Sequence, residues 1–527
     1  HGVIARRDGG GLELWSSCQH PFLVRRQLAQ LFGLGLDNVR LHVPLVGGGF
    51  GGKSYTNIEP LACLAAWLAD RPVRLVNTVE ESMQTTRQHN MTCTMLTAAT
   101  ADGDLLLRRA EILMDTGAYA TNGPTVTFMT GVAAPGPYSW AAIDVTAKCV
   151  YTNRPPAGSY RGFGSSHTQW ISELQLDEVA ERAGLDRFDL RRRNLLRRGD
   201  IVHPAMKPLD ADLEQCFDAV VRAIPRTPPG SDSGVRTGVG IGFGVVPGGA
   251  DPVGNAIVRL RGDGRATIMA GTTEIGQGAR TAFAQIASSV LGLPVEAIDM
   301  PGADTATTPY DRSTGASRST TLVGLAVERA SRDVVTQLSG PLEEVIRSLG
   351  DTGDEIIGRG RVGGPEDSTG FPVFWEVCCS GAVVSVDEGT GKVTVRSTIG
   401  VPDVGQAINP RLVDVQDSGC TVQALGHTLS EALEFGQDGE LLTPSLVQYH
   451  VPLAPDIPGV MGCELVENGD GPGPFGAKGC GEGAFGAVPA ALMTALRDAG
   501  AGLRTLPATP ERVWQTLNPE TSYTERT

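Results

Sequence analysis

The chain has 527 residues, a formal net charge of -15 and a sequence pI near 5.1, and 41% of its residues are hydrophobic against 20% charged. A chain of this length is too long for one hydrophobic core, so we expect two large units. Lysine and arginine are interspersed with acids, which argues against a nucleic-acid surface. No apolar run approaches the ~18 to 20 residues that span a bilayer, which argues against a membrane protein.

The ten cysteines include no C-x-x-C pair, so a zinc site or a cysteine-ligated iron–sulfur cluster on this chain is not expected. Several cysteines stand among apolar residues, which favours buried, reduced thiols. The N-terminus shows no basic-then-apolar signal, and the sequence predicts a cytoplasmic protein. Because it begins at His1 without an initiator Met, we also expect a cut or processed chain.

Residues 12–70 form the first informative block. They predict a short strand, a polar turn and an amphipathic helix, then an alternating strand that runs into GGGFGGK at Gly47–Lys53. The following segment, residues 58–69, reads as a buried helix.

This block contains an alternative function. Gly47–Ser54, GGGFGGKS, satisfies the phosphate-binding pattern G-x-x-x-x-G-K-[ST] between a predicted strand and a predicted helix, so a nucleoside triphosphatase is a rival interpretation. Against it, five of the first six residues are Gly, and Pro60 interrupts the start of the helix. No later apolar strand ends in an Asp suited to hold magnesium.

Strand-like runs and turns alternate from residue 72 to 150, and Asp102-Gly103 predicts a hairpin. A second glycine-lined loop follows at residues 155–164, PPAGSYRGFG. Residues 170–184 have apolar positions at helical spacing and predict a surface helix. The run Arg191–Arg193 is interpreted as the solvated face of that helical region.

A segment rich in Pro, Gly and Ser at residues 224–236 indicates a boundary. We therefore predict one domain over residues 1–226 and a second over residues 235–527. Just beyond the boundary, VGIGFG fails the dinucleotide-binding pattern G-x-G-x-x-G because Phe243 occupies its last glycine position. Strands mixed with helices in both halves predict an α+β fold.

The second half holds further loops of the same kind. A hairpin is predicted at Gly262–Gly264, and a helix from about Arg280 to Val290 places Gln277 at a helix N-terminus, facing any anionic ligand there. The loop STGASRST at residues 313–320 offers hydroxyls and backbone N–H groups of the type that hold phosphates or a pterin. Residues 351–372 have the composition of an exposed linker.

The most unusual stretch is Gly471–Ala491, which surrounds Glu482 with seven glycines and three prolines in 21 residues. Such a composition is not expected to make a packed helix or an ordinary strand, so the backbone itself must approach something closely. Glu482 would then stand at the tip of a tight loop.

Seven of these motifs occur in the order seen in the molybdenum hydroxylases, the family of xanthine dehydrogenases, aldehyde oxidoreductases and bacterial N-heterocycle hydroxylases. They are WSSCQHP at 15–21, GGGFGGK at 47–53, SYRGFG at 159–164, EIGQG at 274–278, GASRS at 315–319, Gln416 in its DVGxxINP context and KGCGE at 478–482. Over essentially all 527 residues the chain resembles the molybdopterin-binding part of the large subunit. The resemblance implies two large, elongated mixed α/β domains.

The resemblance also implies a cofactor and a set of site residues. Molybdenum is held by a molybdopterin, here expected in its cytosine dinucleotide form, and no side chain ligates the metal. A glutamate at the position of Glu482 acts as general base in the family. The matching cofactor-binding positions are Gln19, Gly49, Phe50, Gly51, Arg161, Gly276, Gln277, Gly278, Ala316, Ser317, Ser319, Gln416, Lys478, Gly479 and Gly481. For Arg161 a structural ion pair is the alternative role.

The substrate pocket is expected at Ser54, Met129 and Phe163. Xanthine-active members have a glutamate directly after GGGFGGK, where this chain has Ser54, and their substrate arginine falls by count on Met129. Carbon monoxide dehydrogenases carry a cysteine directly after the arginine that matches Arg161, where this chain has Gly162. The implied reaction on a small molecule is therefore hydroxylation next to a ring nitrogen, or oxidation of an aldehyde.

Partner chains are implied as well. The family's large subunit has a smaller α+β domain before the position of His1, and in bacteria the two [2Fe-2S] clusters and the FAD usually lie on separate chains. We therefore expect an iron–sulfur subunit, an FAD subunit, a chain or fragment carrying the missing N-terminal domain, and a dimer of heteromers. The alternatives are a P-loop nucleotide hydrolase and a non-catalytic scaffold of the same fold.

Overall fold

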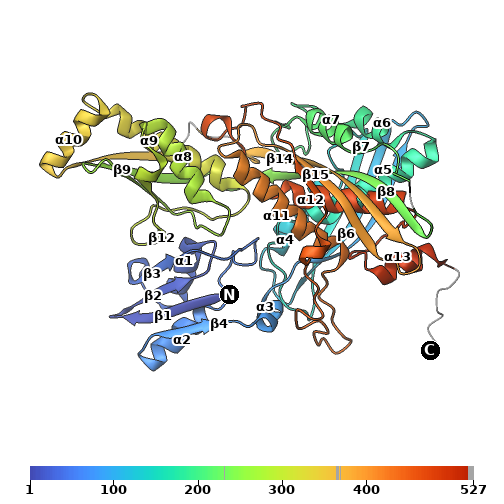
Figure 1. The fold of residues 1–527 in the computed structure, drawn as a ribbon. Coiled ribbons are helices and arrows are strands. Elements are labelled where there is room, and N and C mark those ends of the chain that lie inside the picture. Colours follow the sequence, from blue (N-terminus) through green and yellow to red (C-terminus); the bar gives the residue numbers. More distant parts are fainter. Residues whose placement is uncertain (231, 364–366, 368–369, 520–527) are drawn as a thin grey trace.

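The computed structural model describes residues 1–230, 232–363, 367 and 370–519, which form four β-sheets with helices packed on them (Figure 1). The predicted α+β fold with large mixed units is confirmed. Within those ranges, none of the helices is long and apolar enough to cross a membrane.

The N-terminal sheet has five strands in the order β12-β3-β2-β1-β4. The predicted strands, turn and first helix of residues 12–70 are confirmed, but the helix predicted as buried at residues 58–69 exposes Leu61, Leu64 and Leu68. The elements are β1 (Gly2–Asp8), β2 (Gly11–Ser16), α1 (Pro21–Phe32), β3 (Val39–Val43), α2 (Glu59–Ala69), β4 (Val73–Val76), α3 (Val79–Thr85) and β12 (Ala303–Asp304). Since β12 pairs antiparallel with β3, the second half of the chain completes a sheet of the first.

A three-stranded sheet follows in the order β5-β6-β7, and the hairpin predicted at Asp102-Gly103 joins its first two strands. Four helices accompany it. The elements are β5 (Asn90–Ala99), β6 (Leu105–Gly117), α4 (Gly123–Ala133), β7 (Ala142–Tyr151), α5 (Ser165–Ala183), α6 (Arg187–Asn194) and α7 (Leu213–Ala223).

Helix α5 is largely buried, which corrects the prediction of a surface helix. Its Glu173 and Asp177 pair with Arg191, whose Nε lies 2.7 Å from Glu173 Oε2 and whose Nη1 lies 2.7 Å from Asp177 Oδ1. Arg191 has no exposed surface, so the solvated interpretation of the arginine run is wrong at that residue. Two acids buried on α5 require a buried cation, and a local sequence pattern cannot show that pairing.

Two four-stranded sheets form the second half, in the orders β16-β15-β14-β8 and β11-β10-β9-β13. In Figure 1 the second of these lies at one end of the molecule with α8, α9 and α10. The elements are β8 (Val235–Gly248), β9 (Gly254–Arg261), β10 (Ala266–Ala270), α8 (Ala279–Leu291), β11 (Ile298–Asp299), α9 (Gly324–Thr336), α10 (Leu342–Thr352), β13 (Glu355–Val362), β14 (Phe374–Asp387), β15 (Val393–Asp403), α11 (Pro410–Leu429), β16 (Val460–Cys463), α12 (Gly483–Asp498) and α13 (Pro510–Leu517).

The segment predicted as a linker, residues 351–372, contains β13, which pairs with β9 along its length. The linker interpretation is therefore wrong for Glu355–Val362, where glycine and arginine alternate between Ile357 and Val362 and only the partner strand reveals the pairing. Part of that segment, residues 364–366 and 368–369, lies outside the described residues. The hairpin between β9 and β10 is confirmed.

Helix α12 lies directly on the glycine-rich face of β8. A Cβ added at Gly240 would collide with the backbone carbonyl of Ala491, and one at Gly244 with the carbonyl of Gly483. The helix is buried from Gly483 to Leu496, so the expectation that residues 471–491 make no packed helix is wrong beyond Glu482. The absence of side chains on β8 permits this contact between helix and strand backbones.

We predict that Gly240→Ala destabilises the protein by about 3 kcal/mol or more, because the methyl group overpacks a backbone contact that cannot move aside. Urea denaturation of the variant measures the loss. Gly340→Ala is the matched control, since no atom lies within 4 Å of its Cβ position. Equal stability of the two variants would contradict the direct backbone contact.

Candidate active site

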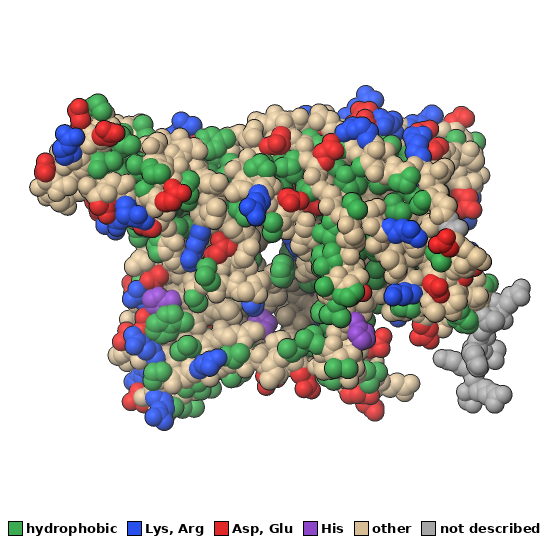
Figure 2. Space-filling model, viewed as in Figure 1, with side chains coloured by type: hydrophobic (Ala, Val, Ile, Leu, Met, Phe, Trp, Pro, Cys, Tyr) green, Lys and Arg blue, Asp and Glu red, His purple; other side chains and the backbone are tan. Residues whose placement is uncertain are grey.

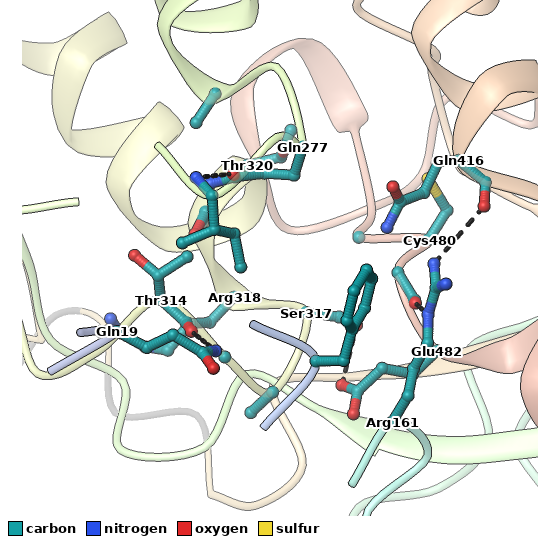
Figure 3. A pocket seen from close by; sticks show the side chains of 18 of the residues that line it. Gln19, Arg161, Gln277, Thr314, Ser317, Arg318, Thr320, Gln416, Cys480 and Glu482 are labelled. Atoms are coloured by element: carbon teal, nitrogen blue, oxygen red, sulfur yellow. Dashed lines mark hydrogen bonds between the residues drawn. The ribbon is translucent and has the colours of Figure 1, made fainter. Parts of the chain in front are cut away.

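A cavity of about 760 Å³ is lined by loops from both halves of the chain. Figure 2 shows the molecule hollowed near its centre, and Figure 3 shows some of the side chains that line the cavity. Every predicted site residue lines it except Gly49. Gly49 lies behind the lining, against the amide of Gln19, where a Cβ would come within 2.5 Å of Gln19 Oε1.

Gln19 joins two of the loops. Its Nε2 donates to the carbonyl oxygen of Thr314 at 2.8 Å, and its Oε1 accepts the N–H groups of Gly51 at 3.1 Å and Lys53 at 3.3 Å. Helix α2 begins at Glu59 rather than directly after Ser54. Because these N–H groups are used by Gln19 and no helix starts at the loop, its geometry does not support the phosphate cradle of a P-loop hydrolase.

Four non-glycine residues of the lining have positive φ angles: Phe50 at 51°, Phe163 at 41°, Ala316 at 56° and Ser317 at 49°. This conformation is costly for residues with a Cβ and persists only where the surroundings impose it. The concentration of such residues in one cavity marks it as a functional site.

The loop before α8 differs from its predicted arrangement. The carboxylate of Glu274 accepts the N–H groups of Gly276, Gly278 and Arg280, each at 3.0 Å, so the anion at this helix end is the protein's own. Gln277 accepts from the N–H of Ile275 and donates to the carbonyl of Thr273. Gln277 does line the cavity, but its side-chain amide holds the loop together and does not point at a ligand.

Arg161 binds backbone oxygens of the loop before Glu482 and of helix α11. Its Nε donates to the carbonyl of Gly481 at 2.6 Å and its Nη2 to the carbonyl of Gln416 at 3.4 Å, and its guanidinium lies 5.6 Å from the centroid of the Phe50 ring. The role of Arg161 shown by these contacts is to fix the loop before Glu482 against α11 (Figure 3).

The side chain of Lys478 is held by two residues that do not line the cavity. Its Nζ donates to the carbonyl of Asp210 at 2.7 Å and lies 3.2 Å from Asp403 Oδ2, and both charged side chains have no exposed surface. The ammonium group is thus engaged in a buried ion pair. Lys478 supports the loop that carries Glu482, and its charge does not point into the cavity.

Glu482 is partly exposed, and it lines the cavity at the N-terminus of α12. Its Oε1 accepts the N–H of Gly162 at 3.2 Å and its Oε2 accepts the hydroxyl of Ser317 at 2.9 Å. Burial raises the pKa of Glu482, while these two donors and the Arg161 guanidinium limit the rise. The site therefore holds a carboxylate that is more basic than usual and fixed at both oxygens.

The predicted substrate residues also meet in this cavity. Met129, on α4, is 8% exposed and Ser54 is 5% exposed, and both line the cavity with Phe163. This part of the lining presents a thioether, a hydroxyl and an aromatic ring. It offers no charged group to a substrate.

The lining fits an anionic pterin cofactor. A Cβ at Gly481 would come within 3.2 Å of Ser317 Oγ and 3.4 Å of Gln416 Nε2, so glycine leaves a small recess between two polar groups. Ser319 and Gln416 present further polar groups to the cavity, and so does Arg312, whose Nε lies 2.6 Å from Asp251 Oδ2. Among the residues that the structure describes, no cluster of His, Cys, Asp and Glu could hold a metal ion by itself.

The predicted set of site residues omitted two groups at the site, although one of them stands in the motif WSSCQHP. His20 lines the cavity, and burial beside Arg312 and Arg318 lowers its pKa to about 3, so its imidazole is neutral. Glu376 lies behind Glu482 on β14. A lone acid in the apolar run FWEVCC was the available signal, because a charge rarely enters a buried strand without a role.

Comparison with known proteins agrees with this geometry. Two family profiles, both described as "Molybdopterin cofactor-binding domain", match residues 1–195 and 221–458. The chain is 29% identical to a subunit of the probable xanthine dehydrogenase of Bacillus subtilis, across 98% of this chain and 74% of that protein.

Two solved structures are also similar. The aldehyde oxidoreductase of Desulfovibrio gigas superimposes with a TM-score of 0.89 at 27% identity, covering 98% of this chain but 59% of that one. The quinoline 2-oxidoreductase of Pseudomonas putida 86 gives a TM-score of 0.87 at 26% identity, covering 98% and 74%. The chain belongs to the molybdenum hydroxylases, a family of molybdenum-dependent oxidoreductases, and matches the molybdopterin-binding part of their large subunits.

We predict that Lys478→Met lowers the free energy of unfolding by about 3–5 kcal/mol, because it leaves the Asp403 carboxylate buried without its cation. Thermal and urea unfolding measure the loss. Arg222→Met, which breaks the exposed pair with Glu464, is the control and should cost less than about 1 kcal/mol. A stable Lys478→Met protein that has lost only its molybdenum would instead assign Lys478 to cofactor binding.

Proposed function

We propose that this chain catalyses the oxidation of an N-heteroaromatic compound, next to a ring nitrogen, or of an aldehyde, with Glu482 as general base. The observation that carries the proposal is the carboxylate of Glu482 in the cavity, held by Gly162 and Ser317 and backed by Arg161. Bound molybdopterin supplies the two-electron oxidation and the activation of water-derived oxygen.

The chain's own residues prepare the proton transfer. Ser317 and Gly162 direct the Glu482 oxygens, so one carboxylate lone pair can accept a proton without reorganisation of the site. Arg161 fixes the backbone of Gly481, and Gln19 holds the loop that carries Phe50. Ser319, Gln416 and the glycine-lined loops at Gly276–Gly278 and Lys478–Gly481 are proposed to hold the cofactor, in its cytosine dinucleotide form.

We predict that Glu482→Gln leaves the molybdenum content unchanged and slows anaerobic reduction of the enzyme by substrate by about 10² to 10⁴-fold. Glutamine keeps the side-chain size and can accept the Gly162 N–H, but it cannot accept a proton. Single-turnover absorbance measurements give the rate, and Glu464→Gln on the surface is the control. Reduction at the normal rate would place the base elsewhere, and loss of molybdenum would make Glu482 structural.

The substrate class follows from the uncharged lining at Ser54, Met129 and Phe163. We predict that quinoline or benzaldehyde is turned over and that xanthine is a poor substrate, because each polar group of xanthine left unpaired costs about 1–3 kcal/mol on burial. Steady-state values of kcat/KM with an artificial electron acceptor compare the three compounds. The Pseudomonas putida structure that resembles this chain is named for quinoline, and the Bacillus subtilis relative for xanthine, so efficient turnover of xanthine is the outcome that overturns this assignment.

Electron transfer requires partners in this proposal. We infer an iron–sulfur subunit and an FAD subunit, assembled with this chain as a dimer of heteromers. The ten cysteines are all unpaired, which supports a reducing compartment such as the cytoplasm.

We predict that the chain without these partners completes one turnover and then stops with NAD or oxygen as acceptor, because each turnover leaves two electrons that must be carried away. Product formed per molybdenum is the measurement. An artificial dye that accepts electrons directly should restore turnover and serves as the control. Sustained turnover with NAD or oxygen and no partner would contradict the requirement.

A further inference from the structure

A second carboxyl group lies directly behind Glu482. Glu376, the third residue of β14, is 1% exposed. Its Oε1 accepts the backbone N–H of Glu482 at 2.5 Å and that of Gly483 at 2.6 Å. Glu482 precedes the first residue of α12, so Glu376 ties the start of this helix, and with it the backbone of the proposed base, to the sheet.

The other oxygen of Glu376 indicates its protonation state. Oε2 is buried and has no hydrogen-bond partner among the described residues. An ionised carboxylate would leave that oxygen's charge unsatisfied, at a substantial desolvation cost. A neutral acid fits the same position, because its carbonyl oxygen can accept both N–H groups while the proton resides on Oε2.

The hydroxyl of Ser317 donates its hydrogen bond to only one of the two carboxyl groups. Its hydroxyl donates to Glu482 Oε2, and it also interacts with Glu376. A hydroxyl has one proton, and here Glu482 receives it.

The neighbouring groups also favour a protonated Glu376. Burial, and then the Glu482 charge, raise the pKa of Glu376 to about 7, against the Ser317 hydroxyl and the two backbone N–H groups, which lower it. The Arg161 guanidinium acts on Glu482 and on Asp417 of α11. The thiols of Cys420 and Cys480, which also face this cluster, are neutral because burial raises the pKa of each to about 12.

We propose that Glu376 is a positioning residue for the catalytic carboxylate: it holds one proton, so that Glu482 is the charged member of the pair, and it fixes the Glu482 backbone at the start of α12. The inference rests on the proposed role of Glu482 as base. With the proton on Glu376, Glu482 enters the reaction as the carboxylate able to accept one.

Two substitutions separate the proton from the backbone contacts. In Glu376→Gln the amide oxygen still accepts both N–H groups and the amide nitrogen replaces the O–H, so the variant imitates the neutral acid. Below pH 7 its rate of reduction by substrate should lie within ~3-fold of the wild-type rate, and the inflection near pH 7 that we expect in the wild-type rate should be absent. Glu376→Ala removes the acceptor of both N–H groups and should slow reduction about 10²-fold through misplacement of Glu482.

A second measurement does not depend on catalysis. Infrared difference spectra of the purified enzyme across pH 7 should show a protonated-carboxyl C=O band that is lost as the pH rises and is absent in Glu376→Gln. Asp417, whose pKa burial also raises to about 7, contributes a band of its own, which Asp417→Asn removes as the matched control.

Two outcomes overturn the inference. One is an infrared titration in Glu376→Gln identical to that of the wild type. The other is a loss of rate in Glu376→Gln below pH 7 as large as in Glu376→Ala. If instead the band titrates as expected while Glu482→Gln reacts at the normal rate, Glu376 does hold a proton, but Glu482 is not the general base.

Discussion

The position of Glu482 depends on the direct contact between the backbones of α12 and β8. Packed layers are normally separated by about 10 Å of interdigitating side chains. Because β8 has glycines where it faces α12, no side chains separate the two elements there. Backbone carbonyls of α12 therefore lie directly against the backbone of the strand. The start of the helix, where Glu482 stands, is therefore set by rigid backbone. Glu376 adds a second constraint from β14, the strand that pairs with β8.

Sequence motifs, taken as a family resemblance, predicted part of the lining of the site, including Glu482 itself. Glycine-rich loops around Phe50, Phe163 and Ser317 indicated close backbone approach, and the structure brings these loops to one cavity. What the loops approach was only partly predictable. Gly479 packs against the carbonyl of Ser317, and Gly49 against the amide of Gln19, so much of the glycine serves contacts between protein segments. The motifs and their order identified the loops of the site because each loop is encoded in a few consecutive residues.

The failures share a physical cause, which is pairing between residues far apart in the chain. Arg191 has the local pattern of a solvated arginine, and only Glu173 and Asp177 of another helix account for its burial. Strand β13 resembles a linker until β9 supplies its hydrogen bonds. Helix α12 contains Pro489 and two glycines and yet is helical, because the hydrophobic cluster around Phe485 buries it on nearly every side. In each case tertiary packing overrides local propensity.

The two predicted domains share both a core and a site. One hydrophobic cluster combines Phe188 and Phe217 of the first half with Phe243 and Trp375 of the second. Polar contacts cross at the cavity as well, from Gln19 to Thr314 and from Arg161 to Gly481. Each of these side chains donates to a backbone carbonyl, an acceptor that cannot rotate away as a side-chain partner could. The geometry around Glu482 is therefore fixed by how the halves meet, and neither half alone contains a complete set of the residues that hold it.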